Sequence, residues 1–584
     1  MKKIINHPET VVEQMCNGIV LAHNELEFIS KYKIIKRKEI NENKVSLLSG
    51  GGSGHEPAHA GFVGIGMLDV AVCGDVFASP SQIQVYQGIK AAAGSKGTLL
   101  IIKNYTGDVM NFKNAAHLAA EDGLEVDYVL VDDDIAVQDS LYTVGRRGVA
   151  GTVFVHKIAG AMAELGENLA DVKRVAEKTI ANVRSIGFAL TSCTTPAKGS
   201  PIFDLPATEM EYGVGIHGEP GIVREEVKTA DELAIRMTDD LLKDMGISDG
   251  LSEEIAVLVN GFGGSPLQEL YLFNNSVMRE LHHRGIKVSA VYVGNYMTSI
   301  DMAGASLTFL KLDDELKTLL FSVSEAPGFK VDGPQSPVEF SEVAVNSNNK
   351  DVSYLVETDL AYATIKNNEI TLNNMIYMID KMVEIIIENE VPFCELDAHA
   401  GDGDFGMSVA KGFRKLKEEW TEILSTSTDI GTFLTECSMI IMEHCGGASG
   451  PIWGSAFRAA GKATEGKSQL TAGEFAEMMQ LVVKGIQATG ERSFGRGAVV
   501  GDKTLIDALV PFADTWLTEA NQGTDVKTIS TKAAKAAVLG AEKTSDIVAR
   551  MGRAGTVGER SLGYPDAGAH ALGFIFTKIS ESIK

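Results

Sequence analysis

Short apolar runs alternate with helix-like segments through the first third of the chain. Four of these runs predict strands, at residues 45–48, 68–72, 98–102 and 126–131. A helix is expected at residues 82–93, because Ser81 before it is a good N-cap. Strands that alternate with helices predict an α/β fold whose sheet has parallel strands.

The pattern repeats once and then changes. A second α/β unit has predicted strands at residues 255–259, 288–293 and 307–312. Prolines and glycines then predict a linker, and beyond it apolar residues such as those between 375 and 386 recur at helical spacing. Thr471 and Glu474 form the pattern of a capping box before one of these helices. We expect roughly eight helices and no strand in this last part.

The expected domain organisation follows from these patterns. A chain of 584 residues is too long for a single core. The predicted parts are a first α/β half at 1–190, a second at 191–330, a linker at 331–365 and an all-helical domain at 366–584.

Composition and charge exclude several classes of partner. A net charge of −25 argues against general electrostatic binding to nucleic acid or to an anionic membrane. No apolar run is long enough to span a membrane, and the start of the chain lacks the apolar core of a signal peptide. The six cysteines are scattered without metal-binding spacing, which predicts reduced thiols in a cytoplasmic protein.

An acidic, glycine-rich stretch at residues 396–406 is the first candidate for chemistry. It carries Asp397, Asp402 and Asp404, and such a cluster of carboxylates suits Mg²⁺ that shares its ligands with substrate phosphates. A calcium EF-hand is excluded, because Met407 and Phe413 would stand at its required glycine and glutamate. A solvated acidic loop without a metal remains an alternative.

Polar and glycine residues follow the predicted strands of the first part. These segments are 49–57, 73–79, 103–108 and 132–134. Ligands bind at the carboxyl ends of strands in such sheets, so we expect a site there. The glycine run at 50–52 is not a Walker A loop, because no Gly-Lys-Ser/Thr follows it. It either lets backbone amides approach a small ligand or forms only a tight turn.

His217 stands between glycines in the second α/β part. Gly213, Gly215 and Gly218 formally match a dinucleotide-binding pattern, but the Glu-Pro-Gly sequence that follows opposes the helix this site needs. Glycine on both sides removes steric cover, so we expect an exposed imidazole. A purely structural histidine is the alternative.

The helical part contains three glycine-rich loops that could hold an anion. They are Gly446-Gly447-Ala448-Ser449-Gly450, Gly552-Arg553-Ala554-Gly555 and Gly563-Tyr564-Pro565-Asp566-Ala567-Gly568. Amides at helix starts can bind phosphate, and Arg553 could neutralise its charge. With the aspartate cluster, these loops favour a phosphate site.

Several motifs together resemble those of the single-chain, ATP-dependent dihydroxyacetone kinases. They are Ser49-Gly50-Gly51-Gly52-Ser53-Gly54-His55-Glu56-Pro57, Gly215-Ile216-His217-Gly218-Glu219-Pro220-Gly221, Leu396-Asp397 with Gly401-Asp402-Gly403-Asp404, Gly501-Asp502-Lys503-Thr504 and Gly558-Glu559-Arg560-Ser561. The resemblance covers nearly the whole chain. It implies a substrate-binding part made of the two α/β units and a nucleotide-binding part that is an antiparallel helix barrel.

The resemblance also implies roles for individual residues. His217 would bond covalently to the substrate carbonyl as a hemiaminal, which a hydroxyketone can form and glycerol cannot. His55 and Asp108 would hydrogen-bond the substrate, with Asp108 as the base or orienter of the attacking hydroxyl. The pocket would be lined by Gly52, Ser79 and Lys103. Asp397, Asp402 and Asp404 would hold two Mg²⁺ ions that bridge the phosphates of ATP. The nucleotide would contact Gly446, Gly447, Ala448, Ser449, Arg553 and Asp566.

Three departures from the family pattern leave the substrate open. Phe405 stands where members often carry histidine or cysteine, and Ala448 replaces a usual hydroxyl residue. In residues 564–567, proline precedes aspartate, whereas the commoner order in the family is Asp-Pro. A kinase for ketotetroses such as erythrulose is therefore an alternative to one for dihydroxyacetone. A component fed by a phosphocarrier and a metabolite-sensing regulator are two more. We also expect a homodimer.

Overall fold

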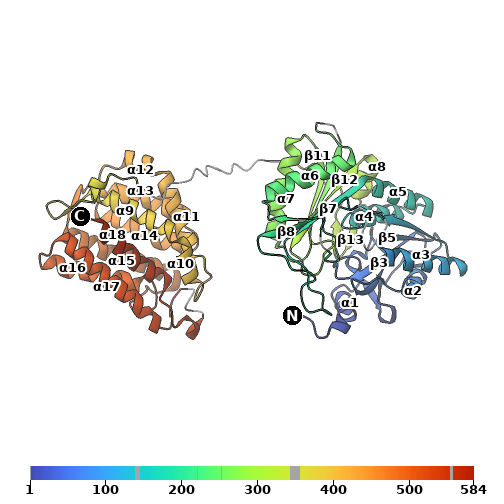
Figure 1. Ribbon diagram of the computed structural model, residues 1–584, viewed down its shortest axis with the longest axis horizontal. Coiled ribbons are helices and arrows are strands. Elements are labelled where there is room, and N and C mark those ends of the chain that lie inside the picture. Colours follow the sequence, from blue (N-terminus) through green and yellow to red (C-terminus); the bar gives the residue numbers. More distant parts are fainter. Residues whose placement is uncertain are drawn as a thin grey trace. The chain divides into compact units, whose positions relative to one another are not determined.

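The computed structural model describes residues 2–137, 145–219, 221–250, 253–341, 356–552, 555 and 557–584. The chain divides into two compact units, Met1–Ala344 and Val345–Lys584. Strands and helices alternate in the first unit, whereas helices make up nearly all of the second (Figure 1). The predicted fold class, α/β followed by all-helical, is confirmed.

The first sheet contains the four predicted strands and two more at one edge. Its order is β1-β2-β4-β3-β5-β6. The strands are β1 (Leu26–Ile29), β2 (Ile34–Arg37), β3 (Ser46–Ser53), β4 (Val70–Val76), β5 (Thr98–Lys103) and β6 (Val126–Val131). As expected, β3 to β6 are parallel, while β1 and β2 are antiparallel to their neighbours. The carboxyl ends of β3, β4 and β5 therefore lie together.

The second sheet is mixed. Its order is β11-β10-β12-β7-β8-β9, and only β10 and β11 pair in parallel. The strands are β7 (Val183–Ala189), β8 (Glu209–Tyr212), β9 (Val223–Glu226), β10 (Glu254–Gly261), β11 (Lys287–Gly294) and β12 (Gly304–Leu312). Residues of β10 alternate between two cores: Val257 packs with the helices on one face, and Leu258 joins the core shared with the first sheet.

Helices cover both sheets, and one of them is buried all round. The helices of this unit are α1 (Val11–Ala22), α2 (Gln82–Ala92), α3 (Thr106–Glu121), α4 (Thr152–Glu164), α5 (Leu169–Asn182), α6 (Ala230–Met245), α7 (Leu267–His283) and α8 (Asp314–Leu320). The predicted cap Ser81 begins α2 with a full capping box. Every residue of α4 from Thr152 to Ala163 is buried, and its apolar residues belong to the core that includes strands of both sheets. The two sheets thus share one core.

The second unit is a closed ring of helices. Its helices are α9 (Leu372–Glu388), α10 (Glu390–Asp397), α11 (Phe405–Glu418), α12 (Trp420–Thr426), α13 (Ile430–His444), α14 (Ser449–Ala463), α15 (Ala472–Phe494), α16 (Ile506–Asn521), α17 (Val526–Lys543) and α18 (Ala567–Ser582). Successive helices from α13 to α18 pack side by side, and α18 packs against α9 (Figure 1). The ring surrounds an apolar cavity of about 150 Å³, whose lining includes Trp453, Phe475 and Phe512.

Of the predictions for this unit, one about a helix cap is confirmed and one about strands is wrong. The capping box is confirmed, since the Thr471 hydroxyl accepts from the Glu474 amide and the Glu474 carboxylate accepts from the Thr471 amide. The expectation of no strand is wrong. Glu369–Thr371 (β15) and Gln469–Thr471 (β16) pair antiparallel for three residues, each just before a helix. Runs this short carry no periodic signal.

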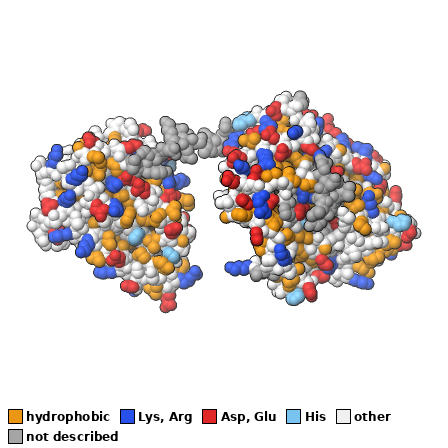
Figure 2. Space-filling view, viewed as in Figure 1, with side chains coloured by type: hydrophobic (Ala, Val, Ile, Leu, Met, Phe, Trp, Pro, Cys, Tyr) orange, Lys and Arg blue, Asp and Glu red, His pale blue; other side chains and the backbone are white. Residues whose placement is uncertain are grey.

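The predicted linker is described only at its ends. A hairpin of β13 (Ser324–Ala326) and β14 (Phe329–Val331) precedes it, and residues 342–355 lie outside the described residues. After them, Leu360–Ala363 forms a short 3₁₀ turn that packs on α9. Among the described residues, none of the helices combines the length and the hydropathy that a transmembrane span requires. Acidic and basic side chains are intermixed on the face shown in Figure 2.

Candidate active site

The carboxyl edge of the first sheet gathers the predicted substrate residues of that part. Lys103 ends β5, and its Nζ lies 3.7 Å from Oδ2 of Asp108 in the first turn of α3. A Cβ atom on Gly51 would lie 3.0 Å from this Nζ and 3.3 Å from this Oδ2. A side chain at this position would displace the pair by a few tenths of an ångström, and the φ of +155° also favours glycine. Ser79 hydrogen-bonds Asp108 from the loop after β4.

Gly52 makes room for the loop after β4. A Cβ atom on Gly52 would lie 2.7 Å from the amide nitrogen of Ala78 and 2.8 Å from Cα of Phe77. Any larger residue would push this loop away from β3. Gly52 therefore lets the loop after β4 lie against β3 at this site.

Two histidines from distant parts of the chain meet at this edge. Nε2 of His55 lies 3.3 Å from Nε2 of His217. Nδ1 of His55 lies 2.8 Å from the carbonyl oxygen of Thr298, which can only accept, so Nδ1 carries the hydrogen. Neutral His55 then presents a lone pair at Nε2, and the hydrogen between the two rings belongs to His217.

The expectation of an exposed His217 is wrong, because aromatic rings enclose it. Its side chain is partly buried, with Tyr105 at 4.5 Å and Phe77 at 5.3 Å between ring centroids, both edge-on. The flanking glycines have another cause. A Cβ atom on Gly215 would lie 1.8 Å from Oε1 of Glu219, and Gly218 has a φ of +70°. The glycines thus permit a tight loop rather than access for solvent.

Burial governs the charges at this site. Burial lowers the pKa of His217 well below 6.5, and the positive charges of Lys103 and Arg147 lower it further. The pKa of His55 is also lowered well below 6.5 by burial, with His217 and Lys103 contributing. Burial raises the pKa of Asp108, and Lys103 opposes this shift. Both imidazoles are therefore neutral near pH 7.

The site also holds buried donors that a ligand could use. Among the described residues, the hydroxyl of Tyr105 is a buried polar atom without a hydrogen-bond partner, and Nζ of Lys103 is a buried donor whose described partner is Asp108 at 3.7 Å. Buried polar groups in folded proteins nearly always find a partner. These two therefore fit a small ligand rich in oxygen atoms.

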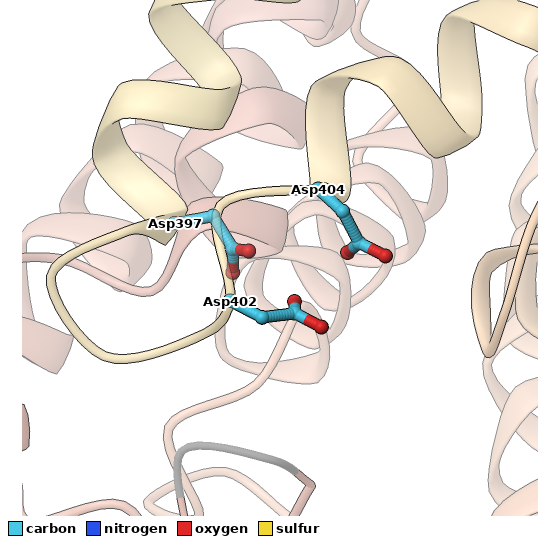
Figure 3. Close-up of side chains that lie close together, drawn as sticks. All are labelled: Asp397, Asp402 and Asp404. Atoms are coloured by element: carbon cyan, nitrogen blue, oxygen red, sulfur yellow. The ribbon is translucent and has the colours of Figure 1, made fainter. Parts of the chain in front are cut away.

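The three aspartates of the helical unit form a second cluster. Asp397 ends α10, Asp404 is the N-cap of α11, and Asp402 lies in the loop between them (Figure 3). Carboxylate oxygens of the three lie within 4.8 Å of one another. The pKa of Asp397 is raised by burial and by its two acidic neighbours, although the Gly403 amide donates to it at 2.9 Å. Three oxygen donors that destabilise one another's charge fit a divalent cation.

The glycine loop at residues 446–448 lies next to this cluster. The Gly446 amide donates to the carbonyl of Ser408 at 3.0 Å, and the Ser408 amide donates to the carbonyl of Asp404 at 2.8 Å. Ala448 is the N-cap of α14, and Ser449 is its first residue. The start of α14 is thus placed beside the carboxylates, where its amides could bind phosphate.

The loop before α18 reaches the cluster from another side. The ring of Tyr564 stacks on His399, with centroids 3.6 Å apart. Asp566 is the N-cap of α18, and its pKa is raised to about 7, chiefly by burial and also by the charges of Asp507 and Asp397. Nζ of Lys503 donates to the carbonyls of Thr544, Ser561 and Tyr564 and so ties these loops together. Arg553 lies outside the described residues.

Two family models match the chain, one in each unit. The Dak1 domain matches residues 17–328, and the DAK2 domain matches residues 399–581. The L-erythrulose kinase of Pectobacterium atrosepticum is 34% identical over 584 residues, which cover 99% of this chain and 96% of that protein. The chain belongs to the dihydroxyacetone kinase family.

Two further similarities within the dihydroxyacetone kinase family differ in extent. The dihydroxyacetone-binding subunit DhaK of PTS-dependent dihydroxyacetone kinase 1 from Listeria innocua is 52% identical over 316 residues, which cover 54% of this chain and 95% of that subunit. The crystal structure of the C. freundii dihydroxyacetone kinase in complex with AMP-PNP and Mg²⁺ is 31% identical in sequence. It matches with a TM-score of 0.60 over 100% of this chain and 99% of that one.

For this member of the dihydroxyacetone kinase family, sequence reasoning missed four residues around His217. Phe77 and Tyr105 lie within segments that follow predicted strands, so their position was a usable signal. Glu219 lies in the motif of His217. Arg147 follows another arginine and looks like a surface residue, yet its side chain is only 2% exposed. Nothing in the local sequence marks it.

Proposed function

We propose that the protein is an ATP-dependent kinase that phosphorylates the terminal hydroxyl of dihydroxyacetone or a similar short-chain hydroxyketone, captured as a hemiaminal on His217. The observation that supports this most is the contact between the Nε2 atoms of His217 and His55, beside Lys103 and Asp108. A neutral, partly buried imidazole beside buried polar groups suits covalent capture of a carbonyl.

The pair of histidines can account for every atom of the capture step. As the hydrogen on Nε2 of His217 moves to Nε2 of His55, the freed electron pair of His217 Nε2 forms the bond to the ketone carbon, and the electron pair of the C=O double bond moves to oxygen. Nε2 of His55 then passes this hydrogen to the oxygen, which becomes the hydroxyl of the hemiaminal. The step is reversible and needs no other reactant.

Asp108 is the group proposed to receive the proton in the transfer step. The terminal hydroxyl oxygen bonds to the γ-phosphorus of ATP, the bond from that phosphorus to the bridging oxygen breaks, and ADP leaves. The hydroxyl proton goes to the carboxylate of Asp108. Burial raises the pKa of Asp108, which strengthens it as a base, and Lys103 at 3.7 Å opposes this shift.

Positioning and charge neutralisation supply most of the catalysis in reactions of this type. Asp397, Asp402 and Asp404 would hold Mg²⁺, two ions in our proposal, which would neutralise the phosphate charge. The starts of α14 and α18 would offer backbone amides to the nucleotide through residues 446–449 and Asp566. We propose that Arg553 also contacts the nucleotide.

A substrate panel tests the proposal. Purified protein with Mg²⁺ and ATP should release ADP with dihydroxyacetone and not with glycerol. Erythrulose belongs in the panel, because a relative similar over its whole length is named an L-erythrulose kinase. A higher kcat/KM with erythrulose than with dihydroxyacetone would identify the tetrose as the preferred substrate. If no ketose leads to release of ADP, the proposed kinase activity is contradicted.

A phosphocarrier-coupled role is the second candidate. The observation that favours it is the 52% identity between the first unit and a subunit of a PTS-dependent enzyme. In such a system the second unit would keep ADP bound and take phosphate from a carrier protein. Repeated turnover with free ATP and no carrier would exclude this role. Release of a single equivalent of product would support it.

Ketone capture should persist to unusually low pH. His217 attacks only when neutral, and its pKa lies well below 6.5 because of burial, Lys103 and Arg147. Protonation therefore removes capture only as the pH falls through this lowered value. Titration from pH 8 to pH 6 with ¹³C-labelled dihydroxyacetone should leave the NMR signal of the adduct carbon nearly unchanged. Loss of half the adduct near pH 6.5 would show that His217 titrates like an exposed histidine.

We also propose that the two units fold independently. In the described residues, the apolar clusters of the first unit and the cluster of the second share no residue. The DhaK subunit from Listeria innocua corresponds to little more than the first unit. Fragments 1–330 and 365–584 should each give a cooperative thermal transition by circular dichroism. Mixing them should restore part of the ADP release, and insolubility of either fragment alone would contradict this proposal.

Cytoplasmic location and a homodimer are part of the same proposal. The six cysteines are free thiols, five of them buried, in keeping with a reducing compartment. Sedimentation of the purified protein would measure its oligomeric state.

A further inference from the structure

A buried arginine lies under the loop that carries His217. The guanidinium of Arg147 donates to Asp134 from Nε at 2.7 Å and to Oε1 of Glu219 from Nη1 at 3.0 Å. Its Nη2 donates to the carbonyl oxygen of Gly213 at 3.0 Å. One side chain thus binds both ends of the loop at residues 213–219.

Glu219 links Arg147 to the backbone of His217. Its Oε1 accepts from Arg147, and its Oε2 accepts from the backbone amide of His217 at 2.9 Å. Because Gly215 has no side chain, it leaves room for the same carboxylate: a Cβ atom there would lie 1.8 Å from Oε1. The chain of contacts runs from Arg147 through Glu219 to the backbone of His217, whose ring then meets His55.

We infer that Arg147 is a positioning residue for ketone capture: through Glu219 and Gly213 it fixes the loop so that Nε2 of His217 faces Nε2 of His55. This inference rests on the proposed function, because it concerns the use of His217 as nucleophile. Arg147 is not a catalytic residue, since its three contacts are with the chain itself.

The choice of arginine fits positioning better than stability alone. Burying a guanidinium among carboxylates costs desolvation energy, and apolar side chains of similar size can stabilise a fold as well. Burial raises the pKa of Asp134 to about 6 even though Arg147 opposes the shift. A rigid fork of donors, however, can hold three acceptors in one fixed geometry, which neither lysine nor an apolar residue can do.

The neighbouring arginine provides a matched control. Arg146 pairs with Asp244 through two hydrogen bonds of 2.7 and 2.8 Å, and its side chain is 21% exposed. Arg146→Met and Arg147→Met remove the same charge from adjacent positions of one segment. Only the second variant removes a contact to the loop of His217.

The experiment measures capture and turnover in full-length protein. With ¹³C-labelled dihydroxyacetone, Arg147→Met should lose most of the adduct signal, and kcat/KM for the ketone should fall by roughly 10- to 100-fold, as small displacements of reacting groups do. The KM for ATP should not change. Arg146→Met should match the wild type within about twofold in both measurements, because its loss leaves the loop contacts intact.

A second pair of variants keeps the inference testable if Arg147→Met does not fold. Glu219→Gln keeps an oxygen that accepts from the His217 amide, whereas Glu219→Ala removes it. The alanine variant should lose most of the adduct. The glutamine variant should keep an intermediate amount, because its one oxygen can accept from the His217 amide while its NH2 group cannot accept from Arg147. A folded Arg147→Met or Glu219→Ala protein with the wild-type amount of adduct would overturn the inference. Wild-type protein without any adduct would overturn the proposed capture itself, and the inference with it.

Discussion

Replacing His217 by alanine should abolish the ketone adduct and lower kcat/KM for dihydroxyacetone by at least about a hundredfold. The variant loses the only group proposed to bond to the substrate carbon, so the terminal hydroxyl is no longer held for transfer. Selectivity against glycerol should fall as well, because His55 and Asp108 can hydrogen-bond either compound. Coupled assay of ADP release and ¹³C NMR of the adduct measure the two effects.

A surface histidine serves as the control for this experiment. His117 lies on α3 with its side chain 74% exposed, so His117→Ala should retain wild-type activity. A crystal soaked with dihydroxyacetone gives the direct view of the bond. Continuous density from a ring nitrogen of His217 to the ketone carbon would support capture. A well-ordered ketone at van der Waals distance would refute it.

Replacing Asp402 by alanine should remove most phosphoryl transfer and leave ketone capture unchanged. The variant takes one of three carboxylates from the proposed metal site, and charge stabilisation of this kind is worth several kcal/mol. Asp402 is exposed, so its loss opens no gap in the core. Without Mg²⁺ the variant should be at least as stable as the wild type, because repulsion among the carboxylates is relieved.

Mg²⁺ titration of activity and a thermal melt with and without Mg²⁺ check this second prediction. Mg²⁺ should raise the melting temperature of the wild type more than that of Asp402→Ala. Asp514, an exposed aspartate on α16, is the matched control, and Asp514→Ala should behave as the wild type. Full turnover by Asp402→Ala in ordinary Mg²⁺ buffer would refute the metal assignment.

The elements that sequence predicted well are those whose signal is local. The run at 98–102 predicted β5 because a strand buried on both faces is apolar throughout, and Ser81 marked the start of α2 by its side-chain chemistry. Helix α4 gave no such signal. Buried on all sides, it has no polar face and hence no amphipathic period.

The site was predictable in its parts and not in its assembly. The aspartates lie within eight residues of one another, so their clustering in the structure follows from the sequence. The meeting of His55 and His217 depends on how two sheets pack, which no local pattern encodes. The role of Arg147 is hidden for the same reason: its contacts are to Asp134, Gly213 and Glu219, and Arg146 beside it makes a surface ion pair.

The wide spacing of the pocket residues has a consequence for the order of folding. His55 is separated by 162 residues from His217 and by 243 residues from Thr298, whose carbonyl fixes its ring. Contacts between such distant positions form late, because long stretches of chain must be ordered first. During synthesis the pocket cannot close until the segment around Thr298 has left the ribosome. A nascent chain that ends before this segment should therefore bind no ketone, however well its first sheet has formed.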